Sequence, residues 1–206
     1  MLEILQMLVS PIFNLAEKLA PGLHERMVGL PVKYGDTIRL MHVATKHALH
    51  SHGINYSHPN SSQQQQVTAY AGHDSNDYWL VKGQHRLPLS KKNGEPARHG
   101  DIIRLEHVAT GRNLHSHIGA QSPLTGQQEV TAFGNDGIGD SNDNWRIEVD
   151  GKGIWFEKKK IRLIHLDTNN ALHSHAGHSH PEFTAGQQEV TCFVERNNDD
   201  FWITDR

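Results

Sequence analysis

The sequence repeats one long motif three times, and this repetition constrains the fold more than any other feature. In the middle copy the motif reads Ile-Arg-Leu-Glu-His at 103–107, a threonine at 110, and Leu-His-Ser-His at 114–117. Closely similar stretches occupy 38–52 and 161–175. Each copy continues with Gln-Gln-x-Val-Thr and an aromatic residue, and it ends on Asp-x-Trp, with the tryptophans at 79, 145 and 202. The three copies account for almost the whole chain after residue 30.

The pattern of alternating residues predicts four strands in each copy. In the opening strand Ile103, Leu105 and His107 point to one side and the residues between them to the other. A short turn leads into Leu-His-Ser-His, and its two histidines should share one face of the second strand. Gln-Gln-x-Val-Thr and the segment after the tryptophan supply two further strands. Because one copy cannot bury its apolar face alone, we predict an all-β fold in which the copies close a three-fold barrel.

The residues before the repeats have a different periodicity. Apolar side chains recur at helical spacing through residues 5–19, and Pro21-Gly22 would end the segment. We expect a short amphipathic α-helix and linker in residues 1–30, followed by the repeat domain at 31–206 with copies at about 33–83, 97–151 and 156–206. The helix would pack on the barrel base, or mediate homo-oligomerisation or partner docking. It contains no apolar run long enough to span a bilayer.

Composition excludes several classes of function. Twenty Lys and Arg residues against 23 Asp and Glu give a net charge of −3, so we expect no nucleic-acid partner. The lone cysteine, Cys192, stands at a strand position and is expected to be a buried structural thiol. There is no nucleophile elbow or phosphate loop, and every promising polar group occurs in triplicate, whereas a catalytic residue is needed once. We therefore expect no enzymatic activity.

The 17 histidines are the one unusual feature of the composition. Three lie in the opening strands, namely His42, His107 and His165, and are expected to be core side chains with Ser, Thr or Gln partners. The pairs in Leu-His-Ser-His are usable zinc half-sites, but three-fold symmetry would spread them around the barrel. We favour structural or ligand-facing hydrogen bonding for these pairs and expect no metal or other cofactor. The third copy, followed by His178 and His180, is where adventitious nickel or zinc would bind.

Together these motifs, in this order, resemble the MIR repeat family, which occurs in protein O-mannosyltransferases, stromal cell-derived factor 2 and intracellular calcium-release channels. The resemblance covers about residues 33–206 in all three copies, and among family members the chain looks most like stromal cell-derived factor 2. It implies a β-trefoil without catalytic activity, linked to protein O-mannosylation or folding quality control. The chain has a helix-like leader where a secretory signal would stand and ends Thr204-Asp205-Arg206, so we expect the cytoplasm rather than the endoplasmic-reticulum lumen.

Binding is the function that the residue pattern favours. Exposed His, Gln and Tyr side chains can hydrogen-bond to and stack on sugar rings or a peptide, and three copies can present several weak sites. The candidate ligand-binding residues are His50, His52, Tyr56, Gln64, His115, His117, Gln121, Gln127, His173, His175 and Gln187. We expect a glycan, glycoprotein or peptide ligand. The alternative is a structural protein whose N-terminal helix makes the contacts.

Overall fold

The computed structural model describes residues 29–205. The expected N-terminal helix and any contact through residues 1–20 lie outside this part of the chain. Within it, no helix is long and apolar enough to cross a membrane. The single α-helix there, α3, is one turn at Pro181–Thr184. The remainder is built from strands and short turns, which confirms the all-β prediction for the described residues.

Twelve strands are present between residues 29 and 205, four from each copy of the motif. The first copy forms β1 (Thr37–His42), β2 (Ala48–Asn55), β3 (Gln65–Tyr70) and β4 (Trp79–Gly83). The second forms β5 (Ile102–His107), β6 (Arg112–Gln121), β7 (Gln128–Phe133) and β8 (Trp145–Val149). The third forms β9 (Ile161–His165), β10 (Ala171–Ser179), β11 (Gln188–Phe193) and β12 (Trp202–Asp205). A single-turn helix precedes the last strand of each copy: η1 (Ser75–Asp77), η3 (Ser141–Asp143) and η4 (Asn198–Asp200). A further one, η2 (Leu89–Lys91), lies between the first two copies.

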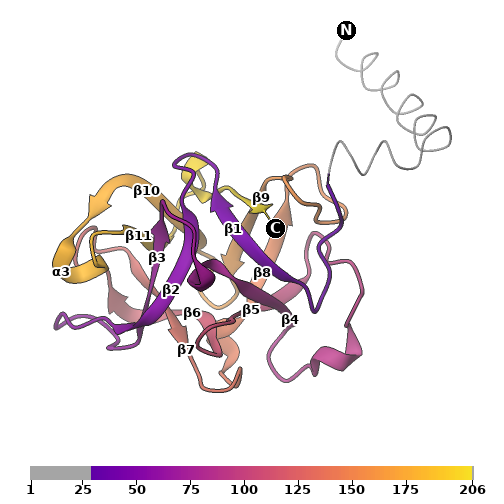
Figure 1. Ribbon diagram of the computed structural model, residues 1–206, viewed down its shortest axis with the longest axis horizontal. Helices are drawn as coiled ribbons and strands as arrows, with labels where there is room; N and C mark the ends of the chain where they lie inside the picture. The colour runs from indigo at the N-terminus through magenta and orange to yellow at the C-terminus, as the bar shows by residue number, and fades with distance from the viewer. Residues whose placement is uncertain (1–28, 206) are drawn as a thin grey trace, which may run out of the picture.

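Six strands close into a barrel. The first and last strands of the copies pair antiparallel in the cyclic order β1, β4, β5, β8, β9 and β12, with β12 returning to β1. The other six strands form three hairpins: β2–β3, β6–β7 and β10–β11. Their inner strands β3, β7 and β11 pair with one another in a triangle. The hairpins therefore close one end of the barrel, and β10 and β11 lie beside β2 and β3 (Figure 1).

The core lies along the shared axis and draws equivalent side chains from all three copies. Trp79, Trp145 and Trp202 are fully buried, and each indole N–H donates to the backbone carbonyl of the leucine in Leu-His-Ser-His of its own copy. Each tryptophan also pairs in register with the opening-strand histidine of the next copy around the barrel. Cys192 is buried, as expected, and burial raises the pKa of its thiol to about 12.

Candidate functional site

The histidines of the opening strands are structural. His42, His107 and His165 have no exposed surface, and each Nδ1 lies 2.8–2.9 Å from the hydroxyl of the threonine three residues on. Each Nε2 lies 2.9–3.0 Å from a backbone carbonyl of the preceding copy around the barrel. A carbonyl can only accept, so Nε2 carries the proton and Nδ1 accepts from the threonine. The prediction of satisfied core histidines is confirmed.

The histidine pairs do share one face, because the two rings of each pair lie within 5.5 Å of each other. The first member of each pair is nevertheless turned inward. His50, His115 and His173 are 2% exposed, and their Nδ1 atoms lie 2.8–2.9 Å from Asp77, Asp143 and Asp200. The second members, His52, His117 and His175, are partly exposed. In the second and third copies the first histidine also bonds to the second, at 3.2 and 3.3 Å, and so orients it. In the first copy the ring nitrogens of His52 are buried, so a direct ligand contact is open to His117 and His175 rather than to His52.

The three aspartates do more than the turn role that their sequence position suggests. Each is the last residue of a single-turn helix and is fully buried. In the second copy, Asp143 Oδ1 accepts from His115, and Oδ2 accepts from the Asp140 backbone N–H at 2.9 Å and from Asn113 at 3.1 Å. Both oxygens are thus used within the fold. This bond was not predicted from the sequence, because the aspartate follows its histidine by 28 positions in the second copy.

The candidate glutamines tie the copies together. Thr131 donates to Gln64 at 2.6 Å, Thr191 donates to Gln127, and Thr68 donates to Gln187, so each bond joins two different copies. Only the amide oxygen is engaged in these bonds, and all three side chains remain partly exposed. Each glutamine therefore has a structural contact and a surface position, and its role in ligand binding stays a prediction.

The other two candidates differ in accessibility. Tyr56 is 4% exposed, and its hydroxyl donates to the backbone carbonyl of Val67 at 3.0 Å, so it supports the first hairpin rather than facing solvent. Gln121 is exposed and lines a cavity of about 570 Å³ with residues from the hairpin loops, among them His58 and Glu182. Gln121 is therefore available to a ligand, whereas Tyr56 is not in this conformation.

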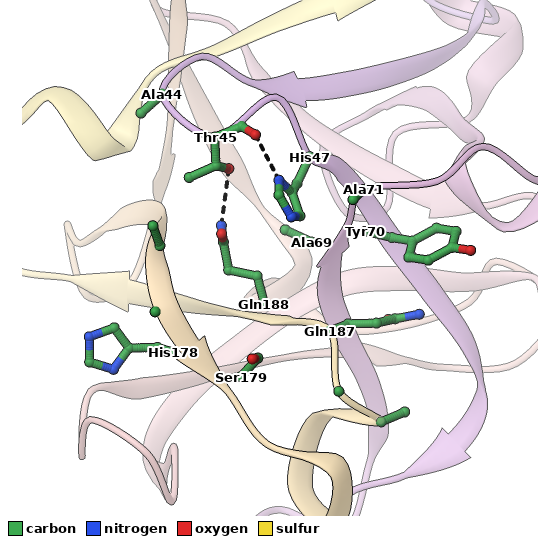
Figure 2. A pocket seen from close by; sticks show the side chains of 14 residues that line it. Ala44, Thr45, His47, Ala69, Tyr70, Ala71, His178, Ser179, Gln187 and Gln188 are labelled. Atoms are coloured by element: carbon green, nitrogen blue, oxygen red, sulfur yellow. Dashed lines mark hydrogen bonds between the residues drawn. The ribbon is translucent and has the colours of Figure 1, made fainter.

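A larger pocket, of about 610 Å³, lies between the first and third copies (Figure 2). Its polar lining includes Thr45, His47, Tyr70, Gln187 and Gln188. Thr45 accepts from the Gln188 amide at 3.1 Å, and the His47 ring bonds to the Thr45 carbonyl at 2.8 Å, which fixes one side of the pocket. Alanine and glycine residues at 44, 69, 71, 176, 177, 185 and 186 make up much of the remaining lining. The result is an open, small-residue recess edged by amide, imidazole and phenol groups.

Of the eleven residues predicted as ligand-binding, only Gln187 lines this pocket. Thr45, His47 and Tyr70 were not predicted as site residues, because more than a hundred positions separate them from the third-copy residues that line the pocket. The pairing of β3 with β11 in the triangle of hairpins brings the two copies together at the pocket. The repeated aromatic after Gln-Gln-x-Val-Thr was the available signal for Tyr70.

The closed barrel with its triangle of hairpins is a β-trefoil. Solved structures of distant sequence share it: a designed three-fold symmetric protein, ThreeFoil, at 15% identity with a TM-score of 0.51, and a ricin B-like lectin from Macrolepiota procera at 16% identity with a TM-score of 0.53. These likenesses concern the fold alone.

The protein class is defined more narrowly by sequence. The MIR domain model matches residues 53–204, and the chain belongs to the MIR domain family. The stromal cell-derived factor 2-like protein of Arabidopsis thaliana is 40% identical over 85% of this chain and 78% of that protein, and human stromal cell-derived factor 2 is 37% identical over 83% and 78%. The crystal structure of the Arabidopsis thaliana SDF2-like protein superposes with a TM-score of 0.79 at 38% identity, covering 86% of this chain and 96% of that one.

Protein O-mannosyltransferases match only in part. The structure of the Saccharomyces cerevisiae Pmt1–Pmt2 complex bound to the sugar donor superposes with a TM-score of 0.76 at 33% identity, covering 87% of this chain but 26% of the transferase chain. The Drosophila melanogaster protein O-mannosyl-transferase 2 is matched over 23% of its length. The chain is therefore homologous to the MIR region of these proteins, and its matches to stromal cell-derived factor 2-like proteins extend over most of their length.

Proposed function

We propose that this MIR β-trefoil is a non-enzymatic binding module that recognises a glycan, or a glycoprotein or peptide carrying one, in the pocket between its first and third copies. The observation that carries the proposal is the lining of that pocket. Tyr70, Gln187 and His47 line the pocket around a floor of small residues, and the Tyr70 ring packs on His50 with centroids 5.0 Å apart at the pocket edge. Sugars present hydroxyls next to apolar ring faces, and such a mixed surface complements both.

The geometry gives Gln187 a defined orientation. Its amide oxygen accepts from Thr68 of the first copy, and its side chain extends towards the side where Tyr70 lies (Figure 2). With the oxygen held in this way, the amide N–H groups are the part of Gln187 suited to donate to a ligand hydroxyl. The Thr45–Gln188 bond closes the neighbouring edge of the pocket. The site therefore presents oriented polar groups without requiring a rearrangement of the barrel.

The relatives give this binding activity a context. Stromal cell-derived factor 2-like proteins and protein O-mannosyltransferases share the domain, so a ligand on the O-mannosylation or protein-folding route is the one we propose. The activity belongs to recognition rather than to catalysis, because the buried His–Asp pairs recur in all three copies and their partners are used within the fold.

The test is a glycan-array screen of the purified full chain, followed by titration of the best glycan. Gln187→Ala is expected to weaken binding about tenfold, the value of one lost hydrogen bond of roughly 1.4 kcal/mol. Gln127→Ala is the matched control, since it removes the same inter-copy bond to a threonine but does not line this pocket. It should leave the affinity within about threefold of wild type.

Two results would contradict the proposal. Equal losses in the two glutamine variants would mean that the inter-copy bond, not the pocket, supports binding. A blank array would favour the alternative, a structural protein whose contacts lie in its N-terminal residues, and deletion of residues 1–28 should then abolish its assembly.

A further inference from the structure

We propose that His175, His178 and Glu189 of the third copy form a binding site for one zinc ion, with the remaining coordination position left to water or a ligand. The nitrogen and oxygen donors of these three residues all lie within 4.8 Å of one another. Two imidazoles and a carboxylate are a donor set that zinc accepts in sites with an open position. The inference is independent of the proposed glycan pocket, although His178 also lines that pocket.

The hydrogen-bond chain behind His175 places a lone pair at the site. Asp200 Oδ1 lies 2.9 Å from His173 Nδ1, so this nitrogen must carry the proton, because a carboxylate can only accept. In a neutral ring His173 Nε2 then accepts, and His175 Nδ1, 3.3 Å away, donates to it. His175 Nε2 is left as an acceptor and faces Glu189 Oε1 at 3.2 Å. With this tautomer, a cation between the two atoms would satisfy both acceptors.

The cation is either a proton or a metal ion, and His178 favours the metal. Its ring stacks on His175 with centroids 4.0 Å apart, and it supplies a third donor atom that a shared proton would not need. The His175–Glu189 separation of 3.2 Å is already close to the donor–donor spacing of about 3.3–3.5 Å around tetrahedral zinc. His178 is partly exposed, and rotation of its side chain would close the remaining gap of about 1.5 Å or less.

Glu189 and His175 are held in place by the layer behind them. Glu189 is almost fully buried, and its Oε2 accepts from Ser122 of the second copy. His175 is oriented by the His173–Asp200 pair, an arrangement that resembles the carboxylate–histidine–zinc relay which fixes the tautomer of zinc ligands. Because Ser122 belongs to the second copy, the position of the Glu189 carboxylate depends on the packing of the second copy against the third.

The other two copies lack the full donor set. In the second copy Ala120 stands where the third has His178, and Glu129 Oε2 accepts from the Ser62 backbone and hydroxyl. In the first copy Gln66 replaces the glutamate. Two further groups, at His50 and His115 with neighbouring aspartates, also bring three donors together. The buried aspartate in each of these groups already uses both oxygens within the fold.

The experiment is a titration of the full chain, without a polyhistidine tag, with Co²⁺ as the spectroscopic probe and Zn²⁺ as competitor. We expect one equivalent of Co²⁺ to give the visible absorption of a four- or five-coordinate site and Zn²⁺ to displace it. His178→Ala and Glu189→Gln should each weaken Co²⁺ binding at least about tenfold, since each removes a ligand. Glutamine is the natural residue at the equivalent position of the first copy, Gln66, so the second variant keeps the shape of the side chain and removes its charge.

Two control variants separate this site from general histidine binding. Glu129→Gln makes the same change in the second copy, and His180→Ala removes a neighbouring exposed histidine outside the donor set. Both should leave Co²⁺ affinity unchanged. The proposal is overturned if Co²⁺ gives no such absorption, if His178→Ala binds it as tightly as wild type, or if Glu129→Gln weakens it as much as Glu189→Gln. Should Glu189→Gln fail to fold, His178→Ala still decides, because its side chain lies at the surface of the pocket.

Discussion

Replacing Asp143 with alanine is expected to lower the free energy of unfolding by about 3–5 kcal/mol, because it removes a buried carboxylate that accepts three hydrogen bonds and leaves the donors unsatisfied. Asp143 is fully buried and accepts from His115, Asn113 and the Asp140 backbone N–H at 2.8–3.1 Å. Its loss leaves buried donors on His115 and Asn113 without this acceptor, at roughly 1–3 kcal/mol each. It also opens the turn that leads into the core tryptophan of β8.

Urea denaturation followed by tryptophan fluorescence would measure this change. The matched control is Asp140→Ala in the same turn, because Asp140 is partly exposed and its side chain caps the Asn142 backbone N–H at 2.8 Å. Loss of that cap should cost only about 1 kcal/mol. An Asp143→Ala protein within about 1 kcal/mol of wild type would show that the His–Asp pair contributes little to the fold.

The fold was predictable from the sequence because the same strand-forming motif occurs three times. Three copies of one alternating pattern indicated three sets of four strands, and the triplicate histidines at 42, 107 and 165 indicated a role in the core, both of which the structure shows. The alternation also placed His115 and His117 on one face, where their rings are 5.3 Å apart. These inferences needed only the periodicity of a strand, which is local.

The site was less predictable because it depends on contacts between copies. Thr45 and Gln188 meet across 143 positions, and Ser122 and Glu189 across 67, and no spacing within a copy predicts either contact. Nor does alternation fix a side-chain rotamer. The alternating pattern predicted which face of the strand His115 occupies, but not that its ring turns inward to bond to Asp143. His115 had been predicted to bind a ligand, and this inward rotamer buries it. The sequence placed His178 close to the third histidine pair, but the position of Glu189 beside these histidines depends on the pairing of β10 with β11.

Stability should fall steeply as the pH drops below about 6.5, because the three opening-strand histidines are buried in the neutral form. Burial lowers the pKa of His42, His107 and His165, against a smaller opposing effect of their bonds to backbone carbonyls. Below pH 6.5 the unfolded chain therefore binds protons that the folded protein does not. Their stabilising contribution is full above the unfolded pKa and is lost as the pH falls towards the depressed folded-state values.

The free energy of unfolding should change steeply with pH, because three equivalent histidines contribute to it. Each histidine contributes up to about 1.4 kcal/mol per pH unit, and three give about 4 kcal/mol per unit at the steepest point. Burial also lowers the pKa of His52 and His117, which act in the same direction. Burial raises the pKa of Glu129, despite opposing bonds from Ser62, so this carboxyl acts in the opposite sense. Its contribution can be removed by measuring in the Glu129→Gln background.

Urea denaturation between pH 5 and 8 would measure how the free energy of unfolding changes with pH. The variant His107→Gln tests whether the opening-strand histidines cause this change. The glutamine amide can donate to the carbonyl of Asn76 and accept from Thr110, which are the two partners of His107, but it does not titrate. The variant should lose some stability at pH 8 and show a maximum slope smaller by about 1.4 kcal/mol per pH unit. A wild-type stability that stays constant from pH 7.5 to 5.5 would mean that the opening-strand histidines take up protons in the folded barrel. In that case the Thr–His–carbonyl bonds would not be holding them neutral.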